Sequence, residues 1–387
     1  MTAMATTIIR VGETRELLAY LPYRLGFRPR ESVVVVSIRG VRGRLGLVAR
    51  VDLADLAHPG TGELTSVGLA SHLWRDGAER TVVAVYADGA RPRGRWRSDV
   101  RDAAQTLVAI LEERVGPTAV WVVDEDRYYC FDCEDASCCP LWGWPLEDLD
   151  STQVSAQMVF AGARVADHRG DLVAVPLVGA KERHNVRRVA GRWELRRAEA
   201  LAADGGVPGS GSVAWRMRGL DAWACAVDAV RAGAPVRSRD IGRITSALQD
   251  VLVRDAVVVA ATASLDAARA ALGGPPDLVS RRIGDAFGML FEPGSELEPT
   301  REGLEAAAQV LREVVAHATD GAHAPALTIL ALLAWWGGDG ATANGWLDKA
   351  NEADPGYRLA ELLGTIVVGG LPPGWVRRAG ARAAELR

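Results

Sequence analysis

The clearest hydrophobic pattern lies at residues 32–38 (SVVVVSI), where odd and even positions are both apolar. A strand with this pattern is typically covered on both faces and lies inside a sheet. Residues 39–44 contain two glycines and indicate a turn, and residues 45–51 form a second apolar run. Together these segments predict a β-hairpin whose first strand is central in a sheet.

Helical and strand patterns alternate through the rest of the N-terminal half. This order predicts an α/β domain, a mixed sheet flanked by helices. The predicted helices are residues 13–25, 63–77 and 98–115, and the predicted further strands are residues 81–86 and 118–123.

The second half of the chain has a different pattern. Residues 204–212 (DGGVPGSGS) combine glycine, proline and serine as a flexible linker does. From residue 215 onward, apolar positions recur at helical spacing, and glycines and prolines separate the segments. We therefore predict an α/β domain at residues 1–203, a linker at 204–212 and an all-α domain at 213–387.

One part of the predicted helical domain is similar to a tetratricopeptide repeat. Gly338 stands at the preceding turn, and the small, large, small and proline positions follow it at the offsets of that repeat. Those positions are Ala343, Leu347, Ala350 and Pro355. The alternatives are a peptide-binding repeat surface and an ordinary packed helical hairpin.

Composition places the chain among soluble globular proteins, at 49% hydrophobic and 24% charged residues. The longest apolar run, residues 325–336, is shorter than the roughly 20 residues that span a bilayer. Residues 1–10 lack the pattern of a signal peptide. We expect a cytoplasmic protein without membrane association.

Charge is unevenly distributed around a formal net value of −4. Residues 101–150 carry 3 basic and 12 acidic side chains, whereas residues 151–200 carry 9 basic and 5 acidic ones. A chain that coats nucleic acid through bulk charge has an excess of Lys and Arg. A protein partner is therefore favoured, and nucleic acid remains a less favoured possibility.

Several segments resemble a known family. The N-terminal match is Leu21, Pro22, Gly26, Phe27, Pro29 and Ser32, followed by residues 48–52 (VARVD). Residues 133–143, 252–255 and 338–363 are similar to it as well. The family is an actinobacterial one, domain of unknown function 4192. The resemblance implies a cytoplasmic actinobacterial protein and carries over no catalytic residues, and Cys130 is an addition to the family's pattern.

Four of the five cysteines lie within ten residues, at Cys130, Cys133, Cys138 and Cys139. Thiolates can hold zinc tetrahedrally, although one Cys-x-x-Cys followed by an adjacent pair is not a standard zinc spacing. The alternatives are structural thiols in a loop and a redox pair formed by Cys130 and Cys133. Zinc is therefore one possible cofactor.

Asp124 and Asp126 follow a predicted strand, where α/β sheets commonly bind their ligands. Such carboxylates could hold a divalent cation or act as acid and base, or they could simply form a solvated turn. No glycine-rich phosphate motif opens a helix, which disfavours ordinary nucleotide enzymes.

Arginines also gather around Trp193, and three of them, Arg187, Arg188 and Arg192, are candidate contacts for phosphate or for an acidic partner. The alternative is a solvated face that pairs with the acidic segment at 101–150.

Two functional hypotheses follow from these patterns. The first is a non-enzymatic interaction or regulatory protein that meets partners through its helical surface and arginines. The alternative is a metal-assisted hydrolase that uses the acidic, cysteine-bearing edge of the sheet. The sequence holds no complete set of nucleophile, base and orienting group, which favours the first hypothesis.

Overall fold

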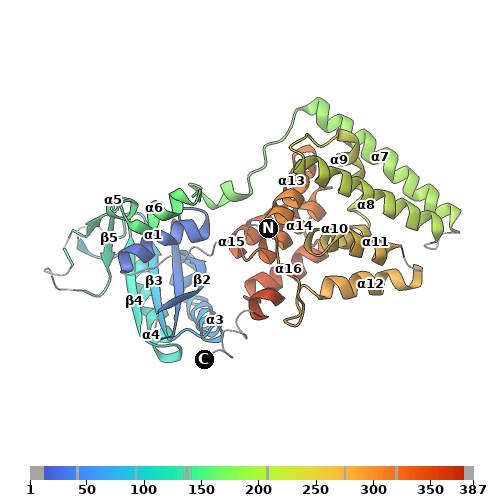
Figure 1. Cartoon of the computed structure of the whole chain (residues 1–387). Coiled ribbons are helices and arrows are strands. Elements are labelled where there is room, and N and C mark those ends of the chain that lie inside the picture. The colour runs from blue at the N-terminus through green and yellow to red at the C-terminus, as the bar shows by residue number, and fades with distance from the viewer. Residues whose placement is uncertain are drawn as a thin grey trace. The chain divides into compact units, whose positions relative to one another are not determined.

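A computed structural model describes residues 13–40, 43–91, 94–133, 135, 139–140, 142–205, 209–273, 276–318 and 321–378. The chain divides into two compact units, Met1–Asp171 and Leu172–Arg387 (Figure 1). Each unit has its own layers and is described by itself.

Unit 1 is built on a six-stranded sheet with the order β2-β1-β3-β4-β5-β6. β3 and β4 are parallel, and all other neighbouring strands are antiparallel. The mixed sheet predicted from the sequence is therefore confirmed. The strands are β1 Ser32–Arg39, β2 Arg44–Asp52, β3 Arg80–Tyr86, β4 Thr118–Val123, β5 Arg127–Cys130 and β6 Trp144–Pro145.

The predicted hairpin is formed by β1 and β2, and β3 lies on the other side of β1. The valines of β1 are fully buried on both faces, as their pattern predicts. At its first residue, Ser32 is in register with both Asp52 of β2 and Tyr86 of β3. The start of β1 and the end of β3 therefore lie at the same edge of the sheet.

Helices cover both faces of the sheet. On one face, α2, α3 and α4 form a hydrophobic core with alternate residues of the strands, including Val33, Val83 and Val122. A second set, α1, α5 and α6, packs together and buries Leu18 and Leu149. The helices are α1 Thr14–Leu25, α2 Leu53–Ala57, α3 Gly62–Arg75, α4 Ser98–Arg114, α5 Glu147–Asp150 and α6 Gln153–Phe160, followed by the 3-10 turn η2 Arg169–Val173.

Unit 2 is helical, and no strand occurs among its described residues. Its core includes Trp223, Trp336 and Trp346, all nearly inaccessible to solvent. The helices are α7 Ala180–Ala203, α8 Ser210–Arg231, α9 Ser238–Ala247, α10 Val251–Thr262, α11 Leu265–Leu272, α12 Pro276–Gly288, α13 Arg301–His317, α14 Ala324–Trp336, α15 Gly340–Ala353 and α16 Arg358–Val368.

The division between the units differs from the predicted one at 204–212. Val173 packs into the core of unit 2 beside Gly345, and the Val178 amide donates to the Ala316 carbonyl. α7 packs against α8 and α9, so residues 172–203 belong with the helices (Figure 1). The glycine-rich segment joins two packed helices of one unit. Residues 206–208 within it lie outside the described residues.

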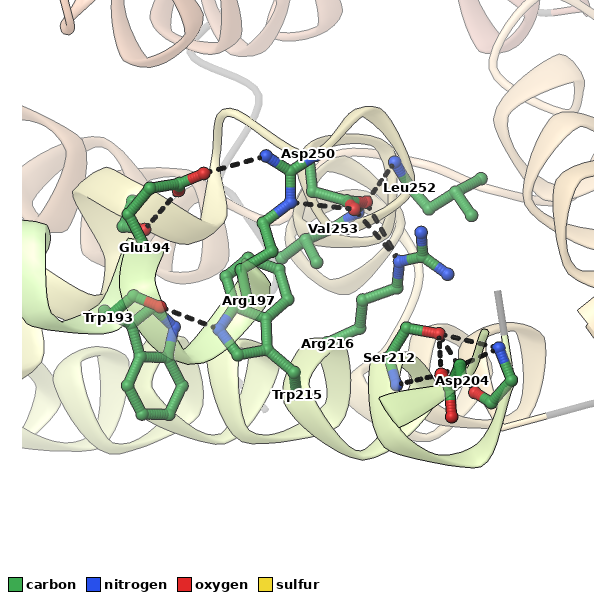
Figure 2. Close-up of polar contacts among 12 residues, drawn as sticks. Trp193, Glu194, Arg197, Asp204, Ser212, Trp215, Arg216, Asp250, Leu252 and Val253 are labelled. Carbon is green, nitrogen blue, oxygen red and sulfur yellow. Dashed lines mark hydrogen bonds and ion pairs between the residues drawn. The ribbon is translucent and has the colours of Figure 1, made fainter. Parts of the chain in front are cut away.

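That segment also has a specific polar anchor. The Asp204 carboxylate accepts hydrogen bonds from the amides of Gly209, Gly211 and Ser212 at 2.8–2.9 Å and from the Ser212 hydroxyl at 2.8 Å (Figure 2). Asp204 thus binds the first turn of α8 to the end of α7. A composition typical of a linker here forms a capped helix–helix connection.

The segment similar to a tetratricopeptide repeat corresponds to α14 and α15. The two helices pack closely, and Gly338, whose φ is +83°, lies in the turn between them. Ala343, Leu347 and Ala350 are all buried. A packed helical hairpin is therefore present, and these three positions contribute to its core.

Candidate functional site

The loops that follow β3 and β4 are joined by Asp124. Its carboxylate accepts hydrogen bonds from the amides of Gly89 at 2.7 Å, Ala90 at 3.1 Å and Glu125 at 2.8 Å. Because β3 and β4 are parallel, both loops leave the same edge of the sheet. Asp124 therefore holds the shape of this edge.

Asp126 lies apart from this arrangement. Its side chain is 80% exposed, and its nearest ion-pair contact is the Arg127 Nε atom at 3.8 Å. The two aspartates predicted to work together therefore have different surroundings. Asp124 is engaged with backbone amides, and Asp126 extends into solvent.

A pocket of about 630 Å³ lies at this edge of the sheet. Apolar residues of α1, β4 and α5 form part of its lining, together with Tyr86 at the end of β3. Charged side chains line it as well: Arg28, Arg30, Asp88, Asp124, Glu125 and Asp150. Asp124 is thus part of the pocket, whereas Asp126 and the cysteines that the structure describes are not among its lining residues.

Tyr86, Arg28 and Arg30 are pocket residues that the sequence pattern did not predict. Arg28 and Arg30 are exposed and alternate with buried Phe27 and Pro29. This period-two alternation is visible in the sequence and could have indicated that both arginines lie on one side of an extended segment. Tyr86 offered no such signal, because an apolar strand commonly ends in an aromatic residue.

A salt-bridge cluster next to the pocket connects Glu31, which directly precedes β1, with Arg97 and Asp99 at the start of α4. Arg97 donates hydrogen bonds to both Glu31 and Asp99, at 2.8 and 2.5 Å for its Nη2 atom. These bonds hold the pKa of Glu31 and of Asp99 below their ordinary values. Glu31 has a φ of +41° and also accepts from the Asp88 amide. The cluster fixes the backbone between Arg30 and β1.

The cysteine segment lies at a second, smaller pocket of about 210 Å³. Arg91 stacks over Trp96 there, with its guanidinium carbon 4.9 Å from the ring centroid. Three cysteines line this pocket: Cys130, Cys133 and Cys139. Cys138 lies outside the described residues.

A zinc site at these cysteines stays a prediction. Among the residues that the structure describes, no group of three or more His, Cys, Asp and Glu side chains is arranged to hold a metal ion. The four-cysteine set includes Cys138, and so it is only partly covered by that finding.

Arg187, Arg188 and Arg192 are exposed on α7. Within the described parts of the chain, none of the three makes a hydrogen bond or ion pair through its side chain. Arg188 and Arg192 are four residues apart and therefore lie on one face of the helix, whereas Arg187, one residue before Arg188, lies on a different side of it. Leu195, 65% exposed, lies on the same face.

This basic surface continues onto α9. Arg196 of α7 and Arg243 of α9 both lie over the Trp193 ring, at 5.6 and 5.0 Å from its centroid. Burial lowers the pKa of Arg243, and the nearby positive charges of Arg239 and Arg196 lower it further. We call this surface the cationic face and define it as Arg188, Arg192, Arg196, Arg239 and Arg243.

Unit 2 also contains a buried arginine that is paired with a carboxylate. Arg216 of α8 donates from its Nε atom to both carboxylate oxygens of Asp250 at 3.1 Å (Figure 2). Asp250 also accepts from the amides of Leu252 and Val253 at the start of α10. Arg197 lies 3.9 Å from Asp250. This buried network holds α8 and α10 together.

None of the helices in the described ranges combines the length and apolar character needed to cross a membrane. Comparison with curated proteins and with solved structures finds no match. A family model described as "Domain of unknown function (DUF4192)" matches residues 15–273 and 298–374, which is most of the chain and includes both the sheet-edge pocket and the cationic face. The chain therefore belongs to the DUF4192 family.

Proposed function

We propose that this chain is a non-enzymatic interaction protein whose cationic face binds an acidic segment of a partner protein. The observation that carries the proposal is the row of exposed arginines on α7, in which Arg188 and Arg192 make no hydrogen bond or ion pair with any described residue and Arg196 lies over the Trp193 ring. We also expect the protein to be cytoplasmic.

The charge of this surface supports an acidic partner. Arg188, Arg192 and Arg196 follow one another at four-residue spacing along α7. Arg243 extends the positive charge across the neighbouring helix, together with Arg239, whose Nε atom lies 3.5 Å from the Asp240 carboxylate. A planar guanidinium binds carboxylates in a two-point fashion, and it loses less hydration than an ammonium group does. Several arginines presented in this way favour a partner with several carboxylates.

Leu195 distinguishes between two kinds of acidic partner. It is 65% exposed among the arginines of α7. A partner protein can cover this side chain with an apolar residue, whereas a phosphate backbone offers no apolar surface to it. The net charge of −4 also gives little long-range attraction to nucleic acid. Both observations favour an acidic segment that also carries apolar residues.

The other surfaces give less support to a function. A metal-assisted hydrolase needs its carboxylates and cysteines together, and Asp124, Asp126 and the cysteine segment lie in three different settings. The hairpin of α14 and α15 offers a second, weaker candidate surface. Ala343, Leu347 and Ala350 of its motif are buried and only Pro355 is exposed, so we assign the partner-binding role to the cationic face.

The test uses fluorescence anisotropy with three labelled probes of equal length. They are a peptide with Glu and Leu at helical spacing, a polyglutamate and a single-stranded DNA. We expect the Glu/Leu peptide to bind most tightly, and its affinity should fall as salt is raised. The Arg188→Glu/Arg192→Glu variant should weaken that binding about tenfold or more.

The matched control is Arg218→Glu/Arg282→Glu. Both arginines are exposed and lie outside the cationic face, so the change in net charge is the same. This control should change the affinity for the peptide less than about threefold. Leu195→Ser should weaken binding of the Glu/Leu peptide and leave binding of polyglutamate unchanged. Equal loss of binding in both double variants, or tighter binding of DNA than of the peptide, contradicts the proposal.

A further inference from the structure

Tyr86, a lining residue of the pocket at the end of β3, has a buried hydroxyl group without a partner among the described residues. Tyr86 is 7% exposed, and its hydroxyl makes no hydrogen bond to any described residue. Tyr86 also lines the pocket of about 630 Å³. Buried polar groups in proteins are nearly always hydrogen-bonded, so an isolated one beside a pocket indicates a missing partner.

The protonation state of Tyr86 specifies what that partner must offer. Burial raises the pKa of Tyr86 well above its ordinary value, so the phenol keeps its proton at neutral pH. A protonated phenol can donate one hydrogen bond. A ligand that satisfies it therefore presents an acceptor, such as an amide carbonyl, at its buried end.

The interior of the pocket is apolar. Leu18 and Ala19 of α1, Val123 of β4 and Leu149 of α5 are all buried and line it. The volume lies within the range of small-molecule sites, which is about 300–1,000 Å³. The body of the ligand is therefore apolar and larger than a single ion.

Charged groups of both signs line the pocket without intramolecular partners. Arg28 and Arg30 are exposed, and neither side chain is hydrogen-bonded or ion-paired within the described chain. The same holds for the exposed carboxylates of Asp88, Glu125 and Asp150. A purely anionic ligand would meet three carboxylates, and a purely cationic one would meet two guanidiniums. A ligand that carries both charges can pair with both sets.

We infer that this pocket is a binding site for a short apolar peptide with free termini. The peptide's carboxylate pairs with Arg28 and Arg30, its ammonium group with the carboxylates, and a backbone carbonyl accepts the hydrogen bond from Tyr86. This site is in unit 1, and the inference does not depend on the function proposed for the cationic face.

The test is calorimetric titration of the full chain with the tripeptide of three leucines. The same peptide with an acetylated N-terminus and with an amidated C-terminus serves for comparison. We expect the free peptide to bind with a Kd of about 1 mM or tighter, and blocking either end should weaken binding about tenfold. In an Arg28→Gln/Arg30→Gln variant, the free and amidated peptides should bind equally. Arg24→Gln, an exposed α1 arginine that does not line the pocket, is the control for lost charge.

Tyr86→Phe tests the buried end of the site and is expected to fold normally. The Tyr86 hydroxyl makes no hydrogen bond within the described chain, so removing it should leave the melting temperature unchanged or raise it. The same change should weaken binding of the peptide about fivefold. Tyr128→Phe, at a buried tyrosine of β5 that does not line the pocket, should leave affinity unchanged. Absence of binding by the free tripeptide overturns the inference. Equal binding of the free and blocked forms, or full affinity in Tyr86→Phe, does so too.

Discussion

Two groups of arginines in unit 2 differ in what they contact. Arg216 is 9% exposed and is bound to the carboxylate of Asp250. Arg188 and Arg192 are exposed and make no ion pair within the described chain. A buried charge must be paired because removing it from water is expensive, whereas an exposed charge stays hydrated alone. The first group therefore serves stability, and the second is available for binding.

The same distinction holds in unit 1. Arg97 is engaged by Glu31 and Asp99, while Arg28 and Arg30 lack ion pairs within the described chain and line the pocket. Arginines that look alike in the sequence thus separate into structural and available groups within each unit. Substitutions at Asp250 and at Arg188 and Arg192 should therefore differ sharply in their effect on stability.

The largest effect is expected from Asp250→Ala. This change leaves Arg216 buried without its carboxylate and removes the N-cap of α10. We expect a loss of about 3–5 kcal/mol in the free energy of unfolding, measured by urea denaturation. Asp250→Asn retains a side chain that can cap α10, so its free energy of unfolding should fall by less. Asp228→Ala, at an exposed aspartate of α8, should change stability by less than about 0.5 kcal/mol.

Gly242→Ala should have the next largest effect, because it acts where α9 meets α7. A Cβ atom at Gly242 would lie 2.7 Å from the Val189 Cβ and 2.8 Å from the Val186 carbonyl oxygen. We expect a loss of about 1–3 kcal/mol from this overpacking, together with weaker binding at the cationic face. Gly284→Ala in α12 is the control, since a Cβ there meets no atom within 4 Å. That control should be neutral or stabilising by up to about 1 kcal/mol.

A smaller, pH-dependent effect is expected from Asp204. Hydrogen bonds from the Ser212 and Gly211 amides and the Ser212 hydroxyl lower the pKa of Asp204 to about 2. The ordinary pKa is near 4, so these bonds stabilise the fold above that pH, and their contribution is lost as pH falls toward 2. The melting temperature of Asp204→Asn should be lower than that of the wild type at neutral pH. This difference in melting temperature should shrink as pH falls from 4 to 2. Asp228→Asn is the control for the loss of one negative charge. A difference in melting temperature between Asp204→Asn and wild type that does not change with pH would contradict the stabilising role of the Asp204 carboxylate.

The smallest effect on stability is expected from Arg188→Gln/Arg192→Gln. Because neither side chain has an ion pair in the described chain, the free energy of unfolding should stay within about 0.5 kcal/mol of wild type. The same variant should lose binding to the acidic peptide. A loss of stability comparable to that of Asp250→Ala would place these arginines in the structural group.

Much of the secondary structure follows from local patterns. The valines of β1 are apolar at every position, and a strand buried on both faces is the arrangement that satisfies such a run. The α7 arginines recur at four-residue spacing, which is enough to place them on one helix face. These features depend on the period of the backbone, and that period can be read from a single segment.

The role of the glycine-rich segment at 204–212 could not be determined in this way. Its composition is typical of a linker, yet Asp204 binds the start of α8 and α7 packs against α9. Composition reports how freely an isolated chain can move, and it contains no information about which distant helices pack on either side. The division between Asp171 and Leu172 likewise depends on contacts such as that of Val173 with Gly345.

The sequence by itself thus determined the α/β and helical halves, the family, and the row of arginines on α7. Tertiary structure alone decided that Asp124 joins two loops while Asp126 faces solvent, and that Tyr86 meets Arg28 and Leu149 at one pocket. These residues are far apart in the chain and share no local period. Only the pairing of β1, β3 and β4 brings them to one edge of the sheet, because long-range contacts, and not neighbouring residues, set that register.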